Sequence, residues 1–149
     1  MNTRAPAILD QLASLADTNR SRILLLLDRH ELTVSEVCSV TQLPQSTVSR
    51  HLKALSDGGW VTARAEGTSN VYTMTRPSPR AARGQHSEGR EELDGTTRRL
   101  WQLVREQVGP TPAAVQDQRR LQSALSERRT KSQEFFSSSA GQWDRLRDE

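Results

Sequence analysis

The stretch LPQSTVSRHLKALSDGGWV, residues 43–61, decides how the N-terminal half of this chain folds. Pro44 is tolerated at a helix start, because its missing N–H would have no helical partner there. Apolar residues then recur at three- and four-residue steps, which predicts a helix of about Gln45–Asp57 with one buried stripe. Gly58 and Gly59 end this helix. The stripe consists of Val48, Leu52 and Leu55.

Three helical patterns precede this stretch. Apolar residues spaced by three and four predict an amphipathic helix over about residues 8–16. The next pattern, about residues 19–29, is apolar on more than one face, which is typical of a helix at the centre of a core. Asp17 or Thr18 can provide its N-cap.

A third, short helix is predicted before the break around residues 42–44. Thr33 or Ser35 can cap it. Two helices joined by a short turn, the second of which begins with small polar residues, are typical of a helix-turn-helix.

A β-hairpin is predicted directly after the second of these helices. Strands near residues 60–64 and 71–75 flank a polar tip at residues 65–70, where Gly67 and Asn70 supply the turn. Helices followed by such a wing predict a winged helix-turn-helix. The expected fold class is therefore mainly α with a small β-hairpin, with dimerisation and appendage helices at the C-terminus.

The C-terminal half is poorer in apolar residues. Residues 76–89 hold two prolines and two glycines, which favours a flexible linker between a DNA-binding domain at 1–75 and the rest. A helix within 90–109 has a broad apolar face that needs a partner on so small a domain. Within 110–149, a final helix from Pro112 to roughly Phe136 is either a solvated, partly frayed appendage or a nucleic-acid contact.

Composition excludes several classes of protein. The chain has 149 residues and no apolar run near the roughly 20 needed to span a bilayer. We therefore expect a soluble, cytoplasmic protein with no membrane partner. One cysteine, Cys38, excludes an internal disulfide. Residues 1–75 carry 7 basic and 7 acidic side chains, so DNA binding there has to come from individually placed residues.

Residues 9–75 resemble the ArsR family of small bacterial winged-helix transcription regulators. The likeness is carried by LADTNRSRILLLL (15–27), ELTVSEV (31–37), the stretch at 43–61 and a wing that ends in VYTMT. The resemblance implies a homodimer that binds a palindromic double-stranded operator, usually as a repressor that an effector releases.

The expected DNA contacts lie opposite the buried stripe of the 45–57 helix and in the wing. Arg50 is the best candidate for a guanine or phosphate contact. His51 either contacts DNA or is a half-buried packing residue, and Asn70 either contacts DNA or only completes a turn. An ordinary solvated helix face is the alternative for the others. The candidates are Gln45, Ser46, Thr47, Ser49, Arg50, His51, Lys53, Arg64 and Asn70.

Dimerisation is expected through the first helix and the 90–108 helix, whose apolar faces would otherwise meet water. The candidate interface residues are Leu9, Leu12, Leu93, Leu100, Trp101, Val104 and Val108.

Metal sensing, the role of many ArsR-like proteins, is not expected. Thr33 and Ser35 stand where the resembling heavy-metal sensors place thiolates, and soft metals need thiolates. The 90–108 helix contains no histidine for the other common site. We expect no metal, no cofactor and no catalytic residues, hence no enzyme, and a small-molecule effector that is not a metal.

The tail RRTKSQEFFSSSAGQWDRLRDE, residues 128–149, resembles the connector of ArsR-like proteins fused to an S-adenosylmethionine-dependent methyltransferase. No Gly-rich cofactor loop follows. The alternative function is therefore the non-catalytic N-terminal part of such a fusion, with the chain being either a fragment or a regulator that kept only the connector.

Overall fold

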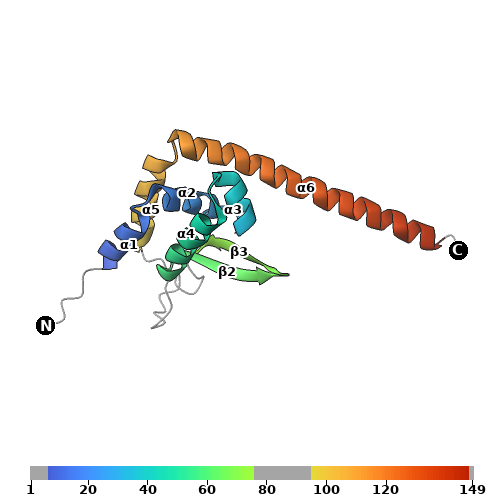
Figure 1. Ribbon diagram of the computed structural model, residues 1–149, viewed down its shortest axis with the longest axis horizontal. Helices are drawn as coiled ribbons and strands as arrows, with labels where there is room; N and C mark the ends of the chain where they lie inside the picture. Colours follow the sequence, from blue (N-terminus) through green and yellow to red (C-terminus); the bar gives the residue numbers. More distant parts are fainter. Residues whose placement is uncertain (1–6, 76–94, 148–149) are drawn as a thin grey trace.

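A computed structural model describes residues 7–75 and 95–147 of the chain, with side chains between 8–75 and 95–137. The predicted linker at 76–89, the start of the helix that follows it and Leu93 lie outside the described residues. The elements are α1 (Ala7–Leu15), α2 (Thr18–Leu27), β1 (Leu32–Thr33), α3 (Val34–Thr41), α4 (Gln45–Asp57), β2 (Val61–Glu66), β3 (Ser69–Met74), α5 (Gly95–Val108) and α6 (Pro112–Arg147) (Figure 1).

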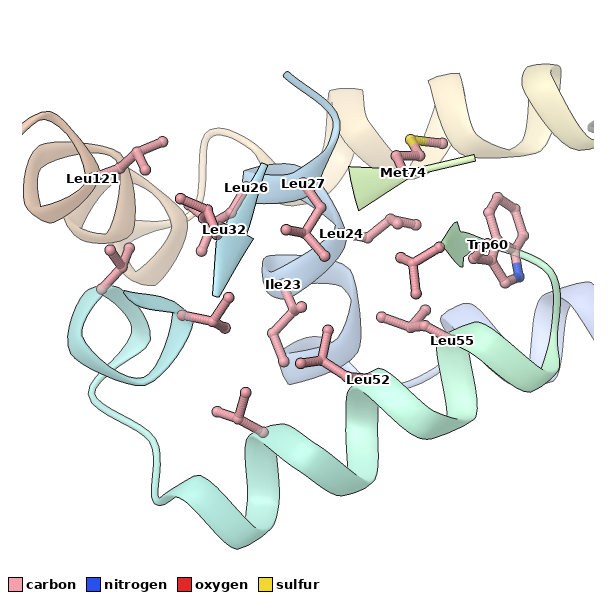
Figure 2. Packing of buried hydrophobic residues seen from close by; sticks show 14 of the residues in the cluster. Ile23, Leu24, Leu26, Leu27, Leu32, Leu52, Leu55, Trp60, Met74 and Leu121 are labelled. Carbon is pink, nitrogen blue, oxygen red and sulfur yellow. The ribbon is translucent and has the colours of Figure 1, made fainter. Parts of the chain in front are cut away.

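Helix α2 forms the centre of the core. Of the two predicted caps, Asp17 is the one used: its Oδ1 accepts the Arg20 N–H at 3.1 Å. Ile23 and Leu52 point toward one another between α2 and α4 (Figure 2). Four apolar side chains of α2 are fully buried, which accounts for its nearly uniform apolar character. They are Ile23, Leu24, Leu26 and Leu27.

The helix-turn-helix has the predicted bounds. Thr33, rather than Ser35, caps α3 through a capping box in which Thr33 and Glu36 bond each other's backbone N–H. Gln42 ends α3 in the left-handed conformation at φ 59°, which is uncommon for a residue with a side chain. Only Leu43 and Pro44 then separate it from α4, so the turn is short.

Three strands form an antiparallel sheet in the order β1-β3-β2. The hairpin is tighter than predicted, because its turn has two residues, Gly67 and Thr68, instead of a six-residue tip. Gly67 has φ +61°, and a glycine at this place in a two-residue turn matches the twist of the strands. Asn70 therefore lies inside β3, opposite Ala65, and not in the turn.

Helices α5 and α6 pack onto the same core. Trp101 of α5 and Leu121 of α6 are buried in one cluster with α2, α3 and α4. The prediction that the last helix ends near Phe136 is wrong, since α6 continues to Arg147. Its far part extends well beyond the other elements (Figure 1). Among the described residues no helix is both long and apolar enough to cross a membrane.

Candidate nucleic-acid interface

Helix α4 has one packed side and one solvent side. Val48, His51, Leu52 and Leu55 are buried. The contact residues predicted on α4, apart from His51, lie on the other side, where five are exposed and Thr47 is half-buried. The exposed ones are Gln45, Ser46, Ser49, Arg50 and Lys53.

The start of α4 has free backbone donors. Pro44 is the N-cap and makes no side-chain cap bond. The first backbone bond at this end runs from the Val48 N–H to the Pro44 carbonyl at 3.0 Å. The amides of the first three residues, 45–47, therefore lack helical acceptors, and the positive end of the helix dipole lies there. Such an end suits a phosphate oxygen.

The two cations of this face are available for a ligand. Neither Arg50 nor Lys53 forms an ion pair with any residue in the ranges that the structure describes. The first turn of α4 carries no acidic residue. This solvent side is therefore a positively charged strip that follows a helix N-terminus.

The wing differs, because its arginine is already paired. Arg64 Nη2 lies 2.6 Å from Glu31 Oε2 and 3.0 Å from Glu66 Oε2. The hydrogen bond to Glu31, with the charge of both glutamates, raises the pKa of Arg64. Arg64 is more than half exposed. Because it is paired, it can contact DNA only if it leaves Glu31 and Glu66 or if their negative charges come close to the DNA as well. Asn70 is also exposed, on β3.

His51 takes the packing position, the second of its two predicted alternatives. It is 7% exposed, and its Nε2 lies 3.9 Å from Asp17 Oδ1. Burial lowers the pKa of His51, although the nearby Asp17 carboxylate opposes this. Because its side chain is buried, His51 is not part of the solvent side of α4.

A second surface is formed by α1 and α5, which are joined by a hydrogen bond from Gln11 Nε2 to Thr97 Oγ1 at 2.5 Å. Leu9 and Leu12 are exposed as a dimer contact requires. Trp101 was wrongly assigned to this surface, because α5 turns its Trp101 side onto the core and leaves only 5% exposed. Leu100, Val104 and Val108 are half-buried.

Two exposed residues of this surface were missing from the predicted set. They are Ile8, 39% exposed, and Leu103, 61% exposed. Leu103 lies two residues from Trp101, which places it on a different side of α5. The sequence signal that could have identified Leu103 was its i, i+3 spacing from Leu100. We call Ile8, Leu9, Leu12 and Leu103 the α1–α5 patch.

Of the two positions where the resembling metal sensors carry thiolates, one has a structural role in this chain. Thr33 is occupied as the N-cap of α3, while Ser35 is exposed. Burial raises the pKa of the Cys38 thiol. In the part of the chain that the structure describes, no three His, Cys, Asp or Glu residues are grouped to hold a metal ion.

Comparison with known proteins agrees with this geometry. Residues 17–63 match the family model of bacterial regulatory proteins of the arsR family. The chain is 41% identical over 75 residues to the HTH-type transcriptional regulator Rv0324 of Mycobacterium tuberculosis, covering 48% of this chain and 33% of that protein. It is 36% identical over 70 residues to the transcriptional activator HlyU of Vibrio cholerae, covering 47% of this chain and 65% of that protein.

A solved structure, reduced HlyU from Vibrio cholerae, superposes with a TM-score of 0.51 at 25% identity, covering 68% of this chain and 87% of that one. In the two sequence alignments, this chain spans 33% of the length of Rv0324 and 65% of the length of HlyU. Residues 17–63 match the arsR family model, and with the wing that follows they form a winged helix-turn-helix.

Proposed function

We propose that this chain is a sequence-specific DNA-binding transcriptional regulator of the ArsR type, acting in the cytoplasm. The observation that carries the proposal is the solvent side of α4. In the second helix of a helix-turn-helix, this side joins the three N-terminal amides, which have no helical acceptor, to Arg50 and Lys53, which form no ion pair with any described residue. Polar side chains of such a helix read base edges in the major groove, while arginine and lysine also bind phosphate.

Arg50 is the residue to which we assign the central base or phosphate contact. It is exposed, lies one turn into α4 and has no competing carboxylate among the described residues. We place Gln45 and Ser46 at a phosphate or base beside it, and Lys53 on the backbone further along. The paired Arg64 and Asn70 make up a weaker, peripheral contact.

We further propose a homodimer that forms through the α1–α5 patch. Four large apolar side chains on two neighbouring helices, between 39% and 61% exposed, favour burial against a second copy. A two-fold axis through this patch repeats α4 once in each protomer. Operator half-sites then lie about one helical turn, roughly 34 Å, apart.

The regulation that we propose is repression by occlusion of the operator, released by a small molecule that is not a metal. Thr33 and Ser35 support the exclusion of soft metals, because hydroxyls are poor ligands for them. Of the two matched relatives, one is described as a transcriptional regulator and the other as a transcriptional activator. A reporter behind the bound promoter separates the two outcomes: we expect expression to fall when the protein is present, and a rise would show activation.

The direct test of DNA binding is a fluorescence-anisotropy titration against the DNA upstream of the gene and against a scrambled duplex, repeated at several salt concentrations. We expect tighter binding to the upstream DNA and a loss of affinity with salt, because phosphate contacts release counterions. Equal, weak binding to this upstream DNA and to the scrambled duplex, together with no enrichment of any sequence from a random library, would refute the proposal.

A further inference from the structure

Helix α6 is fixed to the helix-turn-helix by a buried ion pair. Arg22 of α2 donates from Nε to Asp117 Oδ2 at 2.7 Å and from Nη2 to Asp117 Oδ1 at 2.7 Å. The Asp117 side chain is only 2% exposed and that of Arg22 11%. The hydrogen bonds to Asp117 raise the pKa of Arg22. A two-point pair of this kind fixes orientation as well as distance.

The same arginine also holds the end of α3. Its Nη2 donates to the Thr41 carbonyl at 3.1 Å, and Arg120 Nη1 of α6 donates to the Val40 carbonyl at 3.4 Å. These are the last carbonyls of α3, which have no helical donor and form the negative end of the helix dipole. Asp117 therefore holds the guanidinium that covers this helix end.

The other end of α3 is held by α6 as well. Arg128 Nε donates to Glu36 Oε2 at 3.1 Å, and Arg128 Nη2 donates to the Glu31 carbonyl at 3.4 Å. Glu36 belongs to the capping box of α3. Burial alone would raise the pKa of Glu36, but the bond from Arg128 holds it below its usual value. One helix thus braces both ends of α3.

The turn after α3 transmits this bracing to α4. Gln42, in the left-handed conformation, is followed by two residues before α4 begins. Its N–H bonds the Cys38 carbonyl at 2.8 Å, and its Nε2 bonds the Ser39 carbonyl at 2.6 Å. A turn this short leaves little freedom between the end of α3 and the start of α4. A shift at Thr41 therefore moves the amides of residues 45–47.

We propose that Asp117 is a positioning residue for DNA recognition: through Arg22 it fixes the end of α3, and so the orientation in which α4 meets its base pairs. The inference rests on the proposed DNA-binding function. It assigns to α6 a part in sequence discrimination although α6 itself need not touch DNA.

The test is the ratio of affinities for operator and scrambled DNA in full-length Asp117→Asn. The asparagine keeps the shape but cannot accept both Arg22 donors. Partial unfolding lowers both affinities by one factor and leaves their ratio unchanged, whereas a misplaced α4 lowers only the affinity that depends on base contacts. We expect the ratio to fall about tenfold. The matched control, Glu127→Gln, makes the same charge change at an exposed site of α6 and should keep the wild-type ratio.

A second variant covers the case in which Asp117→Asn does not fold. Arg120→Gln removes the donor to the Val40 carbonyl from a side chain that is 41% exposed, so folding is retained. We expect a two- to threefold fall in the ratio, roughly the effect of one weak hydrogen bond. An unchanged ratio in whichever variant folds would overturn the positioning role.

The failure of the two proposals can be told apart. If wild-type protein showed no sequence preference at all, the proposed function would fail. The positioning of α3 is then read from hydrogen exchange at the Gln42 amide, compared with an amide inside α2. Faster exchange at Gln42 alone in Asp117→Asn supports the bracing, and equal rates in both proteins contradict it.

Discussion

The imidazole Nε2 of His51 lies 3.9 Å from Oδ1 of Asp17, so the packed side of α4 meets the residue that caps α2. His51 is buried, and burial lowers its pKa below the ordinary value of 6.5. The unfolded chain therefore takes up a proton at a higher pH than the folded chain does. The stability that comes from the neutral imidazole is complete above about pH 6.5 and is lost as the pH falls toward the lower folded value.

We expect the free energy of unfolding to decrease between pH 7 and pH 5, by at most about 1.4 kcal/mol per pH unit from this one proton. His51→Gln should flatten the slope, which urea titrations at each pH would measure. Asp17 and Glu36 act in another window, since their pKa values lie below their ordinary 3.8 and 4.5. Their stabilisation is lost only at more acidic pH. An identical slope in His51→Gln would show that this histidine does not contribute.

Arg50→Ala should weaken operator binding by roughly 1–3 kcal/mol, the range for a good base contact. The reason is that Arg50 is an exposed cation on the solvent side of α4 and has no ion-pair partner among the described residues. Anisotropy titration measures the change. Arg129→Ala removes the same charge from an exposed site on α6 and serves as the control. Equal losses in the two variants would mean that only net charge matters.

The proposed dimer can be broken at Leu103, which is 61% exposed. Leu103→Glu would place a charge within the proposed apolar contact, where burial without a partner is unfavourable. We expect sedimentation to show dimers for wild type and monomers for the variant at micromolar concentration. Val115→Glu changes a residue of α6 that is 38% exposed and outside the α1–α5 patch, and should remain dimeric. A wild-type protein that is monomeric under these conditions contradicts the patch as an interface.

Two apolar residues of α6 should differ sharply in their effect on stability. Leu121 is fully buried among α2 and α3 residues, whereas Phe136 is 70% exposed. Leu121→Ala should cost about 2–5 kcal/mol, because it leaves a cavity in the core. Phe136→Ala should cost less than about 0.5 kcal/mol. Urea unfolding of both variants decides whether the first half of α6 is part of the folded domain. If both variants lost the same small amount of unfolding free energy, the first half of α6 would not be part of it.

Removing one charge of the buried pair of Arg22 and Asp117 should destabilise the protein more than removing both charges. Asp117→Ala leaves Arg22 without its partner and should cost about 3–5 kcal/mol. The double change Arg22→Met with Asp117→Leu should recover most of that loss, because it removes both charges while keeping volume. Unfolding curves of the single and double variants give both numbers. A double variant as unstable as the single one would contradict this account.

The helix-turn-helix was predictable because its signals are local. Helix α4 is defined by the apolar stripe of Val48, Leu52 and Leu55 and by the glycines that follow it. Its observed bounds agree with the predicted ones, and no contact with a distant residue was needed to predict them. The choice between Thr33 and Ser35 was also available, since Glu36 stands three residues after Thr33, as a capping box requires. Hydrophobic periodicity and capping chemistry therefore account for this half of the fold.

The parts that were not predicted depend on tertiary contacts. β1 has two residues, too few for an alternating pattern, and exists because it pairs with β3. The broad apolar face of α5 did not show which of its residues would pack into the core. Trp101 was therefore assigned to the dimer interface although it lies in the core. Asp117 stands among polar residues, 95 positions from Arg22, so no spacing links them. The DNA contacts themselves stay predictions.

The length of α6 gives the chain a fixed reach. Arg128 is the last residue of α6 for which the described residues show a bond to the body, through Glu36, and α6 continues as helix to Arg147. Nineteen residues at about 1.5 Å each place its end roughly 28 Å away from that contact. A tilt of about 10° at the docked half would carry the far end by about 5 Å at this radius. A small adjustment of α6 beside α3 and a large displacement of the α6 tip are thus one and the same rotation.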